Sequence, residues 1–416
     1  MIFKVIFITL FGIKILIKSF IDFLNYDYLR KNRDIPEEFK GIVDEKKIIR
    51  IGDYNAEKVR FNLFKEIYET LIVMLFLFTP LFKIYFNWID SLGIAYVMKG
   101  VLFFEIFVIA DTILMLPMEY YTSFGIEQKY GFNNYTFGGW ILDQIKSILV
   151  ALVIYAKVIV TILKSTANNF QFSWSFVLLS TLFVSVFAFI VMYLAPVVLM
   201  PIFYKLKPVE NENLKEKIIE LVEKAGFKVK GVYVANESKK SKHANAMFSG
   251  FGNSRSVILF DTLLNGDYSD DEILAVLGHE IGHGVHNHIV KFLLMTIVEI
   301  FLFFLIVSWL LSTQSIYTSF GIEKNFYAGL FVVMVFVFYV IAYFIQPLNA
   351  AISKRYEYQA DAYSKKLLRN PDNLISTFKK FVLNELSVIE PHPLYEWVYY
   401  THPSLIRRIR RLKESD

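Results

Sequence analysis

Long apolar stretches recur along the chain, each close to the ~20 residues that a helix needs to cross the hydrocarbon core of a bilayer. Seven of them stand out, at approximately residues 2–20, 67–86, 97–116, 145–163, 174–200, 292–311 and 326–344. The first contains Lys4, Lys14 and Lys18 and has no small-residue cleavage site, which favours a retained anchor over a cleaved signal peptide. The pattern therefore predicts a membrane region of seven transmembrane helices.

A long polar insertion, residues 205–291, separates the fifth and sixth apolar stretches. Its segment 211–225 has apolar residues at helical spacing and predicts an amphipathic helix. Residues 229–234 and 256–260 are typical of strands. Between them, HANAMFSGFG (243–252) has the composition of an edge strand that an extended peptide could join, with a plain hairpin strand as the default interpretation.

These patterns divide the chain into four parts. We expect a five-helix membrane region (1–204), the insertion (205–291), the last two membrane helices (292–347) and a C-terminal part (348–416).

Orientation follows from the distribution of positive charge. Lys and Arg are frequent in three polar regions, 25–65, 205–291 and the tail from Lys354, and are scarce in the other loops. With an odd number of helices, this bias places the N terminus outside and all three basic regions in the cytoplasm. Interfacial tryptophans near the expected outer ends agree: Trp88, Trp174 and Trp309.

Composition supports the membrane class and limits the chemistry. Of 416 residues, 55% are hydrophobic and only 20% are charged, which is too apolar for a soluble protein of ordinary charge content. The net charge of +5 needs no nucleic-acid partner, since basic loops beside membrane helices account for it. The absence of cysteine excludes disulfides and thiolate ligands, so any zinc must be held by histidine and carboxylate.

Several predicted spans contain ionisable residues, namely Glu105, Asp111, Lys157 and Glu299. Charges that face lipid are costly, so we expect these side chains to face the bundle interior or a water-filled cavity. Paired charges that only lock helices together are an equally good interpretation.

The stretch DEILAVLGHEIGHGVHNHIVK (271–291) carries the candidate chemistry. His279 and His283 stand four residues apart, so on a helix both imidazoles project from one face and can reach one Zn²⁺. Glu280 is then free to act as general base on a metal-bound water. The alternative is an exposed polar helix face. A helix continuing from His283 into the sixth span would put the metal about 13 Å from the bilayer.

A third ligand is available after the seventh span, in SKRYEYQADAY (353–363). Glu357 can complete a His₂Glu site that leaves one position open for water. Asp361, one turn later, is placed to hold a ligand histidine through its second nitrogen. Pro347 predicts a kink ahead of them. Alone, these acidic residues would more often form a solvated helix face.

The motifs together resemble the CAAX prenyl protease type 1 family. They are VLGHEIGH, RYEYQADAY, NAMFSGFG, SFGIEQKYGFNN (123–134), DQIK (143–146), ILFDTLL (258–264), and HPS (402–404) followed by Arg408. The resemblance implies an all-α membrane protein of seven transmembrane helices enclosing a chamber, with a cytoplasmic α+β zinc metalloprotease domain.

Position by position, the resemblance implies one zinc per chain, held by His279, His283 and Glu357 with Glu280 as base. Asn245 would align the substrate backbone and His402 would stabilise the oxyanion, with Asp361 and Arg408 supporting the ligands. One departure is Gly284, where the family commonly has tryptophan. For the remaining histidines, we expect hydrogen bonding or packing at His286 and His288 and ordinary loop positions at His243 and His392.

The leading functional hypothesis is a membrane zinc endopeptidase that cleaves peptides or membrane-linked proteins, as the family does with prenylated proteins. One alternative is a stress-type quality-control protease, against which the five preceding spans argue. Another is a transporter or receptor in which the motif is accidental. The expected location is a multi-pass protein with its site on the cytoplasmic side, in the inner membrane of a bacterium or the endoplasmic reticulum of a eukaryote.

Overall fold

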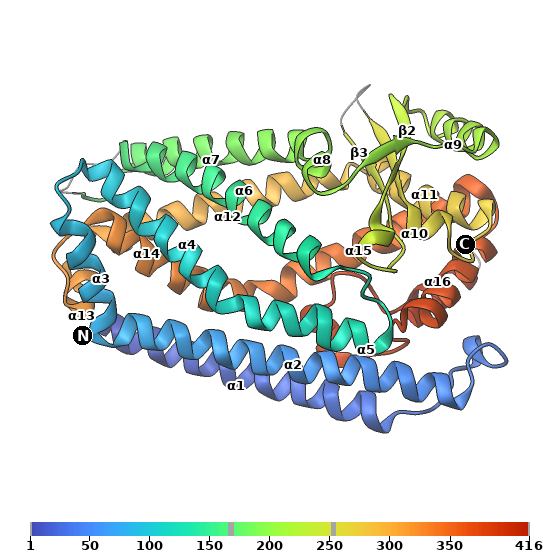
Figure 1. Ribbon diagram of the computed structural model, residues 1–416, viewed down its shortest axis with the longest axis horizontal. Helices are drawn as coiled ribbons and strands as arrows, with labels where there is room; N and C mark the ends of the chain where they lie inside the picture. Colours follow the sequence, from blue (N-terminus) through green and yellow to red (C-terminus); the bar gives the residue numbers. More distant parts are fainter. Residues whose placement is uncertain (1, 165–169, 251–254, 415–416) are drawn as a thin grey trace.

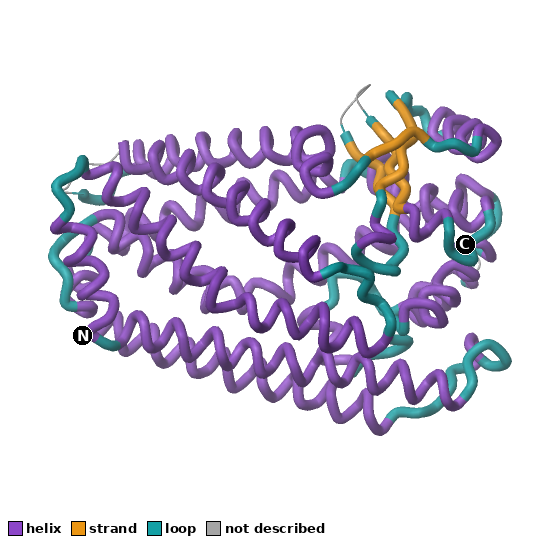
Figure 2. The backbone as a smooth tube through the Cα atoms, in the orientation of Figure 1, coloured by secondary structure: helices purple, strands orange, loops and turns teal. Residues whose placement is uncertain are grey.

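The computed structural model describes residues 2–164, 170–250 and 255–414. Long helices run side by side along the molecule, and a small sheet with shorter helices lies at one end (Figure 1, Figure 2). The long part contains α1 (Ile2–Lys31), α2 (Glu45–Phe78), α3 (Pro80–Ser91), α4 (Tyr96–Tyr120), α6 (Phe137–Lys164), α7 (Trp174–Leu194), α12 (His288–Ser312), α13 (Gln314–Phe320), α14 (Phe326–Phe336) and α15 (Ala342–Leu368).

By length and composition, five helical segments within the described ranges could cross a membrane, or six if the bent pair α2–α3 counts as one span. The five are Tyr96–Tyr130, Phe137–Lys164, Trp174–Phe203, His288–Ser312 and Phe326–Leu368. They contain the third to seventh predicted stretches and confirm that these are helical. The first predicted stretch lies in α1, which is not among the five.

The second predicted stretch, residues 67–86, is not one continuous helix, so the prediction was wrong in that respect; the bent pair α2–α3 could still form one broken span. α2 ends at Phe78, α3 begins at Pro80, and the two axes differ by 61°. Proline has no amide hydrogen and disfavours a helical residue before it, so Thr79 is extended, with φ −106° and ψ 179°. Its hydroxyl donates to the Leu75 carbonyl at 2.6 Å.

The expected helix from His283 into the sixth span is also interrupted. α11 (Asp270–Val285) ends, Asn287 takes a left-handed conformation with φ 53°, and α12 begins at His288. The seventh stretch does continue toward the candidate ligands, from α14 through a π-helical turn at Val337–Ile341 into α15. Pro347 lies inside α15, downstream of that turn.

A four-stranded sheet covers one end of the molecule, in the order β1 (Leu206–Pro208), β2 (Gly231–Ala235), β4 (Ser256–Phe260), β3 (Ala246–Ser249). The two predicted strands and the amphipathic helix, α9 (Glu212–Lys224), are present. Among the described residues β3 pairs with β4 alone, antiparallel, so the segment 243–252 supplies an edge strand that belongs to a hairpin. Positions 251–252 of that prediction lie outside the described residues.

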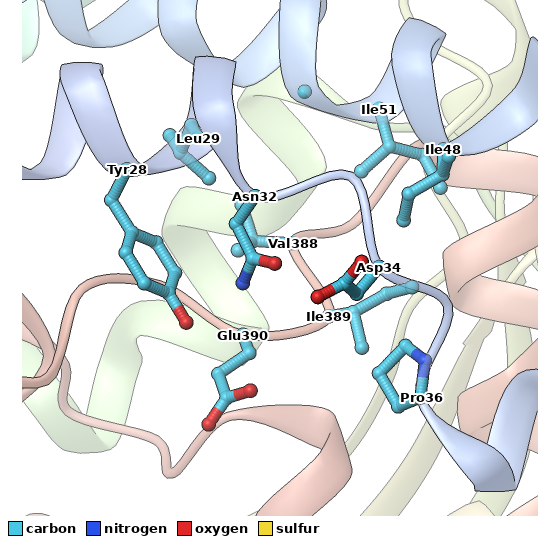
Figure 3. A pocket seen from close by; sticks show the side chains of 11 residues that line it. Tyr28, Leu29, Asn32, Asp34, Pro36, Ile48, Ile51, Val388, Ile389 and Glu390 are labelled. Carbon is cyan, nitrogen blue, oxygen red and sulfur yellow. The ribbon is translucent and has the colours of Figure 1, made fainter. Parts of the chain in front are cut away.

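The C-terminal part folds back along α1 and α2. It contains α16 (Asp372–Glu385), α17 (Pro393–Tyr399) and α18 (Leu405–Lys413). The Asn55 side chain donates to the Leu386 carbonyl at 2.7 Å, and the backbone N–H of His392 donates to Asn25 at 3.0 Å. Figure 3 shows the connecting segment with Ile389 against the turn between α1 and α2, around a pocket of ≈ 40 Å³. The tail is thereby anchored to the first two helices.

Charges within the long helices are partly paired. Lys14 of α1 and Glu66 of α2 form a partly buried ion pair between the two helices, and within α1 Lys18 lies 2.8 Å from Asp22. Of the four residues singled out from the sequence, Glu299 accepts a hydrogen bond from Asn349 of α15 at 2.9 Å. Cross-helix pairing of this kind locks neighbouring helices together.

Candidate metal centre

The helix that carries the two histidines, α11, begins with a capping box. Ser269 caps α11, since its hydroxyl accepts from the Glu272 N–H at 3.3 Å while the Glu272 carboxylate accepts from the Ser269 N–H at 2.7 Å. Such a reciprocal capping box satisfies two N–H groups that a helix start leaves free. It fixes the register in which His279 and His283 share one face.

α11 and α15 cross almost backbone to backbone, because small residues line their contact. A Cβ added to Gly282 would lie 2.9 Å from the Cα of Ala360, and one added to Gly278 would lie 2.8 Å from the Ser364 hydroxyl. That hydroxyl donates to the Ala275 carbonyl at 2.8 Å. The close approach brings α15 against the histidine-bearing face of α11.

At this crossing, His279, His283 and Glu357 bring three ligand atoms within 4.8 Å of one another. The Nε2 atoms of the two histidines lie 3.2 Å apart and are 3.4 and 3.3 Å from the Glu357 carboxylate oxygens. Glu357 Oε2 is buried and has no hydrogen-bond partner among the described residues. Two imidazole nitrogens and a buried carboxylate oxygen without a hydrogen bond form a donor set that fits a divalent cation, and zinc in particular.

Asp361 and Arg408 lie behind the first histidine. Asp361 accepts from His279 Nδ1 at 2.8 Å and is held by the Arg408 guanidinium at 2.8 and 2.6 Å. This contact turns Nε2 of His279 toward Glu357, in the way that ligand histidines are commonly oriented. Burial disfavours charge on His279, but Asp361 and Glu357 outweigh it and raise its pKa to about 9.

His283 has hydrogen-bonding partners of its own, which were not predicted from the sequence. His283 Nδ1 lies 2.9 Å from His288 Nδ1, and His288 Nε2 lies 2.9 Å from Gln359 Oε1. The expectation that His288 takes part in hydrogen bonding is confirmed, whereas Gln359 was missed. Helical spacing along the sequence does not indicate this contact, because it depends on the break between α11 and α12 at Asn287.

Glu280, the candidate base, lies beside the ligands and is half-buried. Burial raises the pKa of its carboxyl, while the neighbouring His279 and His283 oppose the shift. A carboxylate with a raised pKa is better matched to accepting and returning a proton near neutral pH.

His402 reaches the centre from the C-terminal tail. Its Nε2 atom lies 3.3 Å from Glu357 Oε1, although His402 is in the loop between α17 and α18 and Glu357 is on α15. Its side chain is 62% exposed and lines an open cavity of ≈ 380 Å³ together with Arg408 and His243. Although the side chain is open to the cavity, the protein around it partly desolvates the ring and so lowers the pKa of His402, while the charge of Glu357 opposes this shift.

Asn245 lies directly before the edge strand β3, with its side-chain oxygen 2.8 Å from the N–H of Ala246. Its side chain is exposed, and no hydrogen bond joins it to the three ligand candidates in the described structure.

β3 packs against α11. Gly284 faces this strand, and a Cβ there would lie 3.2 Å from both Phe248 and Arg255. Those two side chains fill the space beside Gly284, so the position suits a residue without a side chain.

His243 is not the ordinary loop residue that we expected. Its ring nitrogens lie 3.4 Å from Glu127 and 3.5 Å from Glu385, and the ring stacks on Phe132 with centroids 4.7 Å apart. Burial disfavours the charged ring, but the two carboxylates outweigh it and raise the pKa of His243 to about 9. The prediction failed because both acidic partners are more than a hundred residues away in sequence.

Comparison with known proteins relates this arrangement to one group of enzymes. Peptidase family M48 matches residues 208–416, and the CAAX prenyl protease N-terminal region of five membrane helices matches residues 25–205. CAAX prenyl protease 1 of Saccharomyces cerevisiae is 32% identical over 95% of this chain and 92% of its own length. The CAAX prenyl protease 1 homolog of Homo sapiens is 28% identical over 91% of this chain and 88% of its own length. The crystal structure of S. mikatae Ste24p matches with a TM-score of 0.92 at 29% identity, covering 99% of each chain.

Proposed function

The chain belongs to peptidase family M48, among the CAAX prenyl proteases, and is a membrane metalloendopeptidase; from that premise we propose that it is a zinc enzyme acting on prenylated, membrane-linked proteins. The names of the yeast and human relatives support the substrate class. The reaction is hydrolysis of a peptide bond near the prenylated C terminus.

One observation carries the metal assignment. His279, His283 and Glu357 present ligand atoms within 4.8 Å of one another, and one buried oxygen of Glu357 makes no hydrogen bond to the described residues. Arg408 lies 3.6 Å from this oxygen without hydrogen-bonding it, and a buried carboxylate oxygen that lacks hydrogen bonds is costly unless a cation satisfies it more closely. With no cysteine in the chain, two histidines and a glutamate form the open site typical of a catalytic zinc.

Zinc bound by these three residues would acidify a water molecule and polarise the scissile carbonyl. Glu280 accepts the proton of the attacking water and passes it to the amide nitrogen as the C–N bond breaks. His402 donates from its ring to the carbonyl oxygen as that oxygen gains negative charge. The substrate main chain pairs with the free edge of β3, where Asn245 aligns it.

For the membrane arrangement, we propose seven spans that enclose a chamber, with the metal centre at its cytoplasmic end. α1 and the bent pair α2–α3 would add two spans to the five helical segments that are long and apolar enough by themselves. The charge bias of the polar regions supports the cytoplasmic location of the sheet and the C-terminal tail.

The stress-type quality-control protease is not favoured. The match to CAAX prenyl proteases extends over nearly the whole chain and includes the five membrane helices ahead of the metal motif. A transporter or receptor with an accidental motif is excluded, since the chain belongs to a peptidase family.

The purified chain in lipid nanodiscs can test the proposal with one peptide prepared with and without a farnesyl group. We expect one zinc per chain by elemental analysis and a higher kcat/KM for the farnesylated peptide. Glu280→Gln should keep its zinc and lose about 10²–10⁴ in turnover. Glu357→Ala should lose zinc and activity together.

Two results would contradict separate parts of the proposal. Equal kcat/KM for the two peptides would overturn the prenylated substrate class. Full zinc content in Glu357→Ala would overturn the assignment of the third ligand.

A further inference from the structure

His288 faces back toward the metal centre only because the helix breaks before it. In a continuous helix, a residue five positions after His283 would point about 140° away from it. Asn287 adopts φ 53°, a conformation that asparagine tolerates better than most residues, and this ends α11 and starts α12. The ring of His288 consequently meets that of His283, with 2.9 Å between their Nδ1 atoms.

The hydrogen-bond chain beyond His288 determines which atoms carry protons. Gln359 Oε1, 2.9 Å from His288 Nε2, is an amide oxygen and can only accept, so His288 Nε2 is the donor. In a neutral imidazole the other nitrogen then carries a lone pair, which makes His288 Nδ1 an acceptor. Its partner, His283 Nδ1, must therefore donate, and Nε2 of His283 is left without a proton.

Packing keeps the ring of His288 in this position. His288 is 1% exposed and stacks on Tyr356 with ring centroids 4.2 Å apart and an angle of 10°. Tyr356 directly precedes Glu357 on α15, and Gln359 follows it by three positions. The ring is thus held from α15, the helix that supplies the third ligand.

We infer that His288 and Gln359 are positioning residues that lock His283 in the tautomer whose Nε2 lone pair faces His279 and Glu357. This inference rests on the proposed zinc site. The two ligand histidines would then be supported differently, His279 by the Asp361 carboxylate and His283 by a neutral imidazole whose own tautomer is set by an amide. Partners of this kind typically change metal affinity 10–100-fold when they are removed.

A pair of variants with the same side-chain shape separates this role from simple packing. Asparagine at position 288 can place an amide oxygen near the site of Nδ1 and still accept from His283, whereas leucine of similar size cannot. We expect His288→Leu to release zinc about 10–100-fold faster than the wild-type chain. His288→Asn should stay within about threefold of the wild type, since it retains the acceptor. The readout is zinc transfer to a chromogenic chelator from the purified chain in nanodiscs, with no substrate present.

Gln359→Met provides a test at a half-buried position where folding is less at risk. It should accelerate zinc release in the wild-type background. In His288→Asn it should have no further effect, because the amide oxygen of the asparagine accepts from His283 whether or not Gln359 is present. The ring of His286 makes no side-chain hydrogen bond within the described ranges but stacks on that of His288, with centroids 5.5 Å apart. His286→Leu is therefore the control for packing alone, and its effect on the release rate should be much smaller than that of His288→Leu.

The outcomes distinguish the positioning role of His288 and Gln359, called the relay below, from the zinc site itself. Equal release rates for His288→Leu and the wild type would overturn the relay alone. Faster zinc release from His288→Asn than from His288→Leu would also overturn it, because that order is expected if only apolar packing at the buried position matters. A wild-type chain that binds no zinc would overturn the proposed function and the relay together.

Discussion

At the scale of single residues, the contribution of His402 can be separated from metal binding. Its ring approaches Glu357 to 3.3 Å yet belongs to an exposed side chain of the C-terminal tail. We expect His402→Ala to lose about 10²–10³ in turnover, the usual cost of one oxyanion donor, with zinc content unchanged. Turnover of a peptide and elemental analysis of the same sample check both statements. His392→Ala, in the same tail, should keep full activity, and loss of zinc in His402→Ala would refute the role.

A second residue, His243, should make stability depend on pH. Its pKa is raised to about 9 by Glu127 and Glu385 against the effect of burial, whereas the unfolded chain has the ordinary value of about 6.5. A raised pKa in the folded state means that the stabilisation is complete below about pH 6.5 and disappears as the pH rises through about 9.

The comparison of wild type with His243→Gln measures this effect. The difference in their unfolding temperatures should be largest near pH 6 and should shrink between pH 7 and 10. A difference that stays constant across this range would show that the charge of His243 does not stabilise the fold.

At the scale of helices, the crossing of α11 and α15 determines the distance between the ligands. A methyl group at position 282 would meet the Ala360 backbone at 2.9 Å, where no flexible side chain can give way. Gly282→Ala should therefore push the helices apart, destabilise the chain by about 1–3 kcal/mol and weaken zinc binding. Unfolding temperature and zinc release are the measurements.

Gly12→Ala is the matched control for this crossing. A Cβ at Gly12 meets nothing within 4 Å, so alanine in the middle of α1 should be neutral or stabilise by up to about 1 kcal/mol. Equal behaviour of the two variants would mean that the close crossing does not control the site.

At the scale of the whole molecule, the proposed topology places the sheet and the tail on the side opposite the α3–α4 loop. The chain has no cysteine, so single cysteines can report sidedness without background. Ser91→Cys in α3 and Glu220→Cys in α9 are both at exposed positions. In sealed right-side-out vesicles, a membrane-impermeant maleimide should label position 91 only, and in inside-out vesicles position 220 only. Labelling of both from one side would refute an odd number of spans between these two positions, where the proposal places α4, α6 and α7.

Local chemistry along the chain was sufficient for much of this picture. Apolar length predicts helices 97–116, 145–163, 174–200, 292–311 and 326–344, because a membrane helix satisfies its own backbone hydrogen bonds and needs only enough apolar residues. The i, i+4 spacing of His279 and His283 is also local, and so is the spacing of Glu357 and Asp361. The absence of cysteine restricts the ligand types without any knowledge of the fold.

Other features exist only in the tertiary structure, because they join segments that are distant in sequence. The bend at Thr79 and the break at Asn287 are short interruptions that hydrophobicity alone does not reveal. The contacts of His243 with Glu127 and Glu385 required the packing of three separate elements.

The metal centre shows the same division. The sequence by itself determined which side chains could bind zinc and act as base, since these depend on residue type and helical period. The tertiary structure decided how close the ligands come, through the glycine-lined crossing of α11 and α15. It also decided which residues orient them, because Arg408, His288 and Gln359 reach the histidines only after helices far apart along the chain have packed together.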